Sequence, residues 1–176
     1  MNMRVRIIAA NVLCAGAIAA AQAQVTKESV PGIVNFAKVE TTVACAGATT
    51  PAALAEVKRM GYASVINLRQ ASEPGAEIEA SAAAAKAAGL NYIHIPFNTA
   101  SPDAAVVDTF IKAVTDKANQ PAFIHCASAN RAAALWMVKR IAVDKWDVER
   151  ASTEAAALGL TNPALKAFAI EQAQKR

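Results

Sequence analysis

The segment Phe123-Ile-His-Cys-Ala-Ser-Ala-Asn-Arg131 decides the fold of this chain. A short apolar run over residues 121–124 leads into it, and apolar residues at helical spacing follow it from Ala134 to Ala142. Such a run followed by such spacing is typical of a buried strand that turns through a tight loop into a helix. The segment therefore predicts a strand, a loop and the first turn of a helix in direct succession.

The loop between Cys126 and Arg131 has the composition of an anion site. Backbone N–H groups at a helix N-terminus attract anions, and the same field favours a thiolate over a thiol. Arg131 adds a permanent planar charge that can bind two oxygens of a tetrahedral oxyanion. We therefore expect Cys126 to be a nucleophile. The expected anion-binding groups are those of Ala127, Ser128, Ala129, Asn130 and Arg131.

A purely structural interpretation of the same loop stays open. In that interpretation Cys126 is a buried cysteine beside a helix start, and Arg131 is a solvated residue of the first helical turn. His125 is then a core histidine that binds the backbone, which is also compatible with a role in orienting the loop. The loop alone does not decide between the two interpretations.

The pattern His125-Cys126, followed after four residues by Arg131, resembles the signature of the cysteine-dependent phosphatase superfamily, His-Cys-x5-Arg and then Ser or Thr. It is more similar to the phosphatase-like domain of the β-lactamase-hydrolase-like family, whose loop His-Cys-x-x-Gly-x-Arg is one residue shorter. Two further segments resemble this family, Gly61 to Arg69 with Glu73, and Ala88-Gly-Leu-Asn-Tyr92. Together the similar segments extend over about residues 33–160.

The resemblance implies a phosphatase-like hydrolase that acts on phosphate monoesters through a thiophosphate on Cys126. It implies that Arg131 and the loop amides hold the phosphate oxygens, and that His125 orients the loop and helps to keep the thiol ionised. A general acid should protonate the leaving oxygen, and the candidates are Asp103 and Glu73. Asp103 is explained better as an acid at a helix start, and Glu73 could equally be the ion-pair partner of Arg69. The implied partner is a phosphorylated small molecule or a phosphoprotein.

Two departures from the family pattern leave other functions open. Ala129 stands where the family has Gly, and Ala132 stands where the superfamily has the hydroxyl that eases departure of the thiolate. The missing hydroxyl predicts slow breakdown of the phosphoenzyme, and Ala129 is strained if its φ is positive. The short loop also resembles that of rhodanese-like sulfurtransferases, which form a persulfide on the cysteine. A third alternative is a non-catalytic periplasmic module that binds an anion without turnover.

Strand and helix signals alternate along most of the chain, which predicts an α/β fold. The resemblance makes this fold cysteine-phosphatase-like, with a mostly parallel central sheet flanked by helices. The loops after Cys45, Leu68, Pro96 and Ile124 should meet at the edge where parallel strands end. We expect strands over 34–39, 42–45, 64–68, 91–96 and 121–126, and helices over 51–61, 76–88, from Ser101-Pro102-Asp103 onward, after the loop, over 148–158 and over 163–174.

Residues 1–23 have the layout of a secretory signal peptide, with Arg4 and Arg6, a short apolar run and the cleavage-like Ala21-Gln-Ala23. Residues 24–176 then form a single phosphatase-like domain, which we expect to be periplasmic or secreted. Loss of the two arginines lowers the formal charge from +4 to +2. The remaining sequence has no basic cluster that would suggest nucleic-acid binding. No later apolar run is long enough for stable membrane insertion.

The remaining cysteines, Cys45 and Cys126, would face an oxidising compartment after export, where a reversible disulfide between them is expected. The histidines are His94 and His125 alone, and the cysteines lack zinc-ligand spacing. The sequence therefore predicts neither a metal site nor a cofactor.

Overall fold

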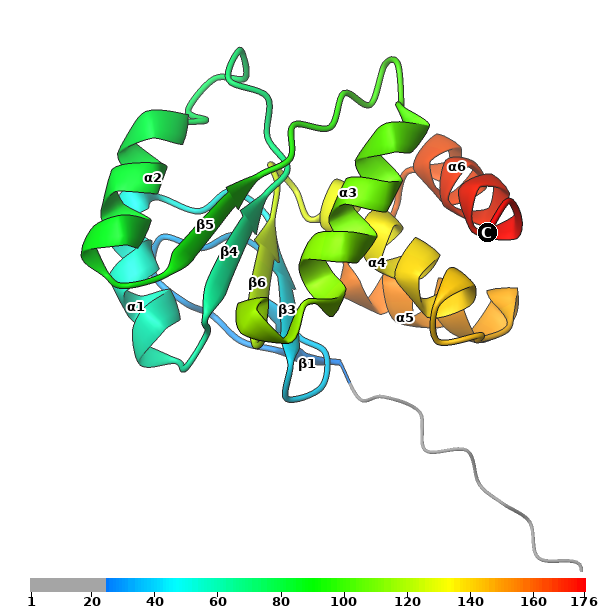
Figure 1. Cartoon of the computed structure of the whole chain (residues 1–176), viewed down its shortest axis with the longest axis horizontal. Helices are drawn as coiled ribbons and strands as arrows, with labels where there is room; N and C mark the ends of the chain where they lie inside the picture. Colours follow the sequence, from blue (N-terminus) through cyan, green and yellow to red (C-terminus); the bar gives the residue numbers. More distant parts are fainter. Residues whose placement is uncertain (1–24) are drawn as a thin grey trace, which may run out of the picture.

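A computed structural model describes residues 25–176 of the chain (Figure 1). The signal peptide expected over residues 1–23 lies outside the described residues. Six strands form one sheet in the order β1-β2-β3-β6-β4-β5. The pairs β3–β6, β6–β4 and β4–β5 are parallel, whereas β1–β2 and β2–β3 are antiparallel. The expected α/β fold with a mostly parallel sheet is confirmed.

The three inner parallel strands are buried along their whole length. They are β3 (Val43–Ala46), β6 (Ala122–His125) and β4 (Ser64–Asn67). Strands covered on both faces read as nearly continuous apolar runs, which is why the sequence indicated them clearly. The fourth parallel strand, β5 (Asn91–His94), lies at one edge of the sheet and is partly exposed.

The N-terminal strands differ from the prediction. The strand expected over 34–39 is reduced to β2 (Ala37–Lys38), and β1 (Thr26–Lys27) was not predicted. Asn35 has a φ of +50°, so the chain turns there instead of continuing as a strand. The preceding residues, Ile33 and Val34, instead bind the loop that follows β3, through Thr49 and Ala48.

Helices cover both faces of the sheet (Figure 1). A 3-10 turn η1 (Pro51–Ala53), α1 (Leu54–Arg59) and α2 (Ile78–Ala87) lie on one face. The other face carries α3 (Ala104–Thr115), α4 (Asn130–Ala142), α5 (Val148–Leu158) and α6 (Pro163–Gln174). A second 3-10 turn, η2 (Lys117–Asn119), leads into β6. Each layer of helices buries its own apolar cluster against the sheet.

The helix α4 lies between the sheet and the last two helices, which it contacts extensively. Its residues from Arg131 to Val138 are all buried, so it lacks the polar face of a surface helix. Because α4 follows β6 directly, its N-terminus is fixed at the carboxyl edge in the middle of the sheet (Figure 1).

The start of α3 is later than the sequence suggested. Ser101 does not cap it and Pro102 precedes it, because the capping residue is Asp103, whose Oδ1 accepts the N–H of Ala105 at 2.8 Å. Either a hydroxyl or a carboxylate can cap a helix, so the pattern Ser-Pro-Asp allowed both positions. Within residues 25–176, no helix is long and apolar enough to cross a membrane.

Candidate active site

The loop between β6 and α4 is held in place by the loop that follows β3. The N–H of Cys126 donates to the carbonyl of Ala46 at 3.2 Å, and the carbonyl of Ala127 accepts the N–H of Ala48 at 2.9 Å. Gly47 makes this close approach possible, because a Cβ there would lie 3.1 Å from the carbonyl oxygen of Ala127. Cys126 is 1 % exposed, so only a small part of its surface reaches the solvent.

Ala129 adopts the left-handed conformation, the case in which the sequence analysis expected strain. Its φ is +77° and its ψ is −15°, the left-handed region in which a Cβ costs about 1–2 kcal/mol. The methyl group is fully buried and faces Gly159, where an added Cβ would lie only 3.3 Å away. The strained residue is thus accommodated by a glycine at the end of α5, and the chain turns there into α4.

Arg131 reaches across the edge of the sheet with its guanidinium group. Its Nη1 donates to Glu73 Oε1 at 2.5 Å and to the carbonyls of Leu68 and Phe97, each at 3.0 Å, and its Nη2 donates to Glu73 Oε2 at 2.7 Å. A guanidinium group has five N–H donors in a planar fork. These contacts occupy the Nη1–Nη2 edge. Within residues 25–176, no oxygen accepts a hydrogen bond from the Nε–H or the second Nη2–H on the opposite edge, which we call the free edge.

The free edge of Arg131 belongs to the same site as Cys126. Burial opposes the charge of Arg131. The hydrogen bonds from Arg131 to Glu73, and the charge and hydrogen bond of the neighbouring Cys126, nevertheless raise the pKa of Arg131 above its ordinary value. The guanidinium group therefore stays charged beside the sulfur. This arrangement allows two parallel donors to meet an oxyanion held next to Cys126.

Glu73 is fully engaged in orienting Arg131. Besides the two contacts with Arg131, its Oε1 accepts the N–H of Gln70 at 2.7 Å, and its Oε2 accepts Nε of Arg69 at 3.4 Å. Partial burial opposes the charge of Glu73, but the bonds from Arg131, Gln70 and Arg69 lower its pKa to about 2. A carboxylate with this pKa holds no proton near neutral pH, so Glu73 is unsuited to be the general acid.

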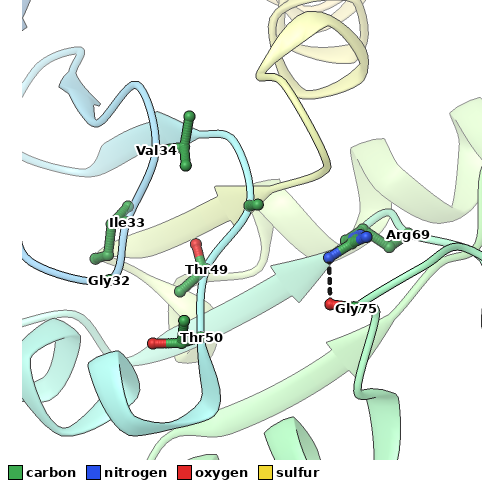
Figure 2. A pocket seen from close by; sticks show the side chains of 8 residues that line it. Gly32, Ile33, Val34, Thr49, Thr50, Arg69 and Gly75 are labelled. Carbon is green, nitrogen blue, oxygen red and sulfur yellow. Dashed lines mark hydrogen bonds between the residues drawn. The ribbon is translucent and has the colours of Figure 1, made fainter.

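Arg69 holds the loop that carries Glu73. Its Nη1 donates to the carbonyl of Gly75 and its Nη2 to that of Pro74, both at 2.6 Å. Figure 2 shows the bond to Gly75 at the rim of a small hollow that Thr49 and Thr50 also line. The predicted pair of Arg69 and Glu73 exists, but it is longer than the pair with Arg131. The two arginines and one carboxylate leave this cluster with a net charge of +1.

His125 is neutral in this environment. It is 1 % exposed and stacks on Phe123, with the ring centroids 5.7 Å apart. Burial, together with the nearby charge of Arg69, lowers the pKa of His125 to about 3. Any help that His125 gives to the ionised thiol would therefore come from a neutral ring, and this role remains a prediction. A role for its ring in shaping the loop remains a prediction.

A polar pocket of about 410 Å³ opens beside Arg131 and Glu73. Leu165 of α6 also lines it, together with polar residues of the connections that follow β4, β5, β6 and α5: Gln70, Thr99, Ser128, Asn130, Thr161 and Asn162. Asn130, expected to bind the anion, has its side chain in a different role, because its Oδ1 accepts the N–H groups of Thr161 at 2.8 Å and Asn162 at 2.9 Å. It therefore ties the start of α4 to the connection between α5 and α6.

Residues 35–143 match the model of the family described as Beta-lactamase hydrolase-like protein, phosphatase-like domain. The chain belongs to this family. No curated protein matches the sequence. Membership confirms the resemblance that the loop and the segment from Gly61 to Arg69 suggested.

Several solved structures share the fold of this phosphatase-like domain. TpbA of P. aeruginosa is 18 % identical, with 89 % of this chain and 92 % of that chain covered and a TM-score of 0.66. A DUF442 protein of Shewanella putrefaciens CN-32 is 21 % identical, with 82 % and 92 % covered and a TM-score of 0.69. The core catalytic domain of the PP-IP phosphatase SIW14 of S. cerevisiae is 16 % identical, with 81 % and 87 % covered and a TM-score of 0.66.

The other general-acid candidate of the phosphatase-like domain, Asp103, is not among the residues that line the pocket. It is exposed at the N-terminus of α3, in the connection from β5 that also supplies the pocket residue Thr99. One of its carboxylate oxygens caps the helix, and no other contact of its side chain is formed within residues 25–176. Asp103 thus has a free oxygen that Glu73 lacks.

Cys45 and Cys126 are both buried free thiols in the same apolar cluster. Burial raises the pKa of Cys45, and the neighbouring Cys126 adds to this effect, so Cys45 is a poor nucleophile. The β3–β6 register aligns Cys45 with Ile124, so Cys126 lies two residues further along. No group of metal-ligating side chains gathers anywhere in residues 25–176.

Proposed function

We propose that this chain hydrolyses phosphate monoesters, with Cys126 as the nucleophile. The free Nε–Nη2 edge of Arg131 carries the proposal, because it offers a charged two-donor fork beside the sulfur. The net charge of +1 in the cluster around Glu73 also favours a bound anion over water. Family membership supports the same class of chemistry.

In the first step, the thiolate of Cys126 attacks phosphorus, so that a P–S bond forms and the P–O bond to the alcohol breaks. Arg131 and the loop amides from Ala127 onward stabilise the charge on the three equatorial oxygens of the phosphoryl group. Asp103 donates a proton to the leaving oxygen and takes one from water in the second step. Water then breaks the P–S bond, which releases inorganic phosphate and restores the thiolate.

The second step should be the slow one. Ala132 is fully buried at the position where the superfamily has a hydroxyl, so no donor there assists the departing thiolate. Ser128 is an alternative donor, because its Oγ accepts Nδ2 of Asn130 at 3.3 Å and its own proton remains free. We therefore expect a rapid first release of alcohol, followed by slower turnover.

The decisive experiment compares two activities of the purified protein. Cys126-dependent release of phosphate from 4-nitrophenyl phosphate, with a burst of nitrophenol, supports the proposal. Cys126→Ser should abolish both, and Arg131→Lys should reduce turnover strongly, because Lys cannot offer the planar fork. Transfer of sulfur from thiosulfate to cyanide that requires Cys126, without phosphate release, would show a sulfurtransferase instead. Absence of both activities, with phosphate still bound, would indicate the binding module.

We also propose that the protein acts outside the cytoplasm after removal of residues 1–23. The proposal rests on the arginines, the apolar run and the sequence Ala21-Gln-Ala23. Its substrate would then be a phosphorylated small molecule or protein of that compartment.

A further inference from the structure

We propose that the polar pocket beside Arg131 binds the leaving alcohol of the substrate, and that this alcohol is a polyol such as a sugar or sugar alcohol. The inference rests on the proposed function, because it names the class of phosphate ester that the site takes. The pocket shares Arg131 and Ser128 with the phosphate site, so a group bound in it is continuous with the bound phosphate.

The pocket is lined by groups that suit hydroxyls and not an aromatic ring. Among the described residues that line it, none is aromatic, and the single large apolar one, Leu165, is only 3 % exposed. Pockets that bind aryl groups bury them against apolar and aromatic side chains. A phenol placed here would gain little apolar contact and would separate polar side chains from water.

Three of the lining side chains have unused hydrogen-bonding capacity. In the part of the chain that the structure describes, the Gln70 amide and the Thr99 hydroxyl have no protein partner. Asn162 uses only its Oδ1, which accepts the N–H groups of Ala164 and Leu165, so its Nδ2 remains free. Hydroxyl groups both donate and accept, so they can pair with all three side chains.

Other lining side chains bind one another, which fixes the shape of the pocket. Thr161 donates its hydroxyl to Asn130 Oδ1 at 3.3 Å, and Asn130 Nδ2 donates to Ser128. The volume of about 410 Å³ lies within the range of small-molecule sites, roughly 300–1,000 Å³. A prearranged rim with three free polar groups is the arrangement that discriminates between a polyol and an alkyl chain of equal length.

A phosphopeptide fits this pocket less well. Extended peptides commonly bind by adding a strand to an exposed sheet edge. The edges of this sheet are β1 and β5, whereas the pocket lies at the end of β6, in the interior of the sheet. A phosphorylated peptide would therefore have to bind here mainly through its phosphate group, without strand pairing of its backbone.

The test compares esters that differ in hydroxyl content but not in chain length. We expect kcat/KM for glucitol 6-phosphate to exceed that for hexyl phosphate by about tenfold or more, the effect of a few added hydrogen bonds. Gln70→Met and Thr99→Val keep the side-chain size, and each should reduce this ratio by roughly threefold to tenfold. Thr153→Val, on the exposed face of α5, is the matched control and should leave the ratio unchanged.

Binding to the inactive Cys126→Ser protein makes the test independent of turnover. Calorimetry should show tighter binding of glucitol 6-phosphate than of hexyl phosphate, O-phosphotyrosine or a phosphoserine peptide. Equal binding of the first two, or a preference for the aryl or peptide ligand, would overturn the inference even if Cys126-dependent phosphatase activity is present. Loss of that activity with the polyol preference retained would instead refute only the proposed hydrolysis.

Discussion

Replacement of Glu73 by Gln tests whether this carboxylate maintains the site. Glu73 joins Arg131 in a two-pronged ion pair at 2.5 and 2.7 Å and also binds Arg69 and the N–H of Gln70. The side chain of Arg131 is only 8 % exposed. The variant Glu73→Gln preserves the size of the residue but leaves two almost buried guanidinium groups without a counter-charge.

The magnitude follows from the pKa of Glu73. A fall from the ordinary 4.5 to about 2 corresponds to roughly 3 kcal/mol of stabilisation of the charged form. Because 21 % of the Glu73 side chain is exposed and water screens part of the interaction, we expect Glu73→Gln to lose about 2–3 kcal/mol near pH 7.

The pH dependence of this loss has a definite sign. The pKa of Glu73 is lower in the folded state than in the unfolded state, so its contribution is complete above the unfolded value of 4.5. The contribution disappears as the pH falls through the folded value of about 2. The wild-type protein should therefore lose its advantage over Glu73→Gln between about pH 5 and pH 2.

Urea unfolding at several pH values measures this difference directly. Glu79→Gln, an exposed change on α2, is the control and should differ from the wild type by less than about 0.5 kcal/mol. Activity gives a second measurement. Glu73→Gln makes the site more positive, but it also removes the ion pair that orients the guanidinium group of Arg131, so phosphate binding and turnover should respond differently. We expect kcat to fall about tenfold or more, with inorganic phosphate bound no more weakly. A stability difference that is the same at all pH values would refute this account of Glu73.

Four further predictions address other parts of the molecule. Asp103→Asn should reduce kcat for alkyl phosphates about 10²–10⁴-fold, but much less for 4-nitrophenyl phosphate, whose leaving group needs no proton. Asn caps helices as well as Asp does, so an unchanged free energy of unfolding is the internal control. Ala129→Gly removes about 1–2 kcal/mol of strain but also a buried methyl group worth about 0.8 kcal/mol, so the free energy of unfolding should rise by only about 0.2–1.2 kcal/mol. Phosphate turnover should rise, and a fall in turnover would show that strain is not limiting. Mild oxidant should join Cys45 to Cys126 after a shift of the loop, and peptide maps that always show free thiols would reject this. Intact mass of exported protein should begin near Gln24, and a retained Met1 would contradict the predicted cleavage.

The sequence predicted those parts of the site that depend on residues close together in the sequence. The strand, loop and helix around Cys126 were evident from apolar spacing. The family glycine at the position of Ala129 raised the possibility of a positive φ there, which the structure shows. The pairing of Glu73 with Arg131 was not predicted, because the two residues are 58 positions apart and their contact depends on how the β4 and β6 ends pack. A contact with Arg69, four residues from Glu73, was the local alternative that the sequence could suggest.

The guanidinium group of Arg131 explains why the anion site and the fold cannot be separated. It binds the carbonyl of Leu68 after β4, the carbonyl of Phe97 after β5 and the carboxylate of Glu73, although its own residue follows β6. One side chain therefore joins the carboxyl ends of three parallel strands. The contacts that orient its free edge toward the anion are the same contacts that close this edge of the sheet. An anion bound to that edge should consequently stabilise the folded chain, since binding to the native state alone shifts the unfolding equilibrium.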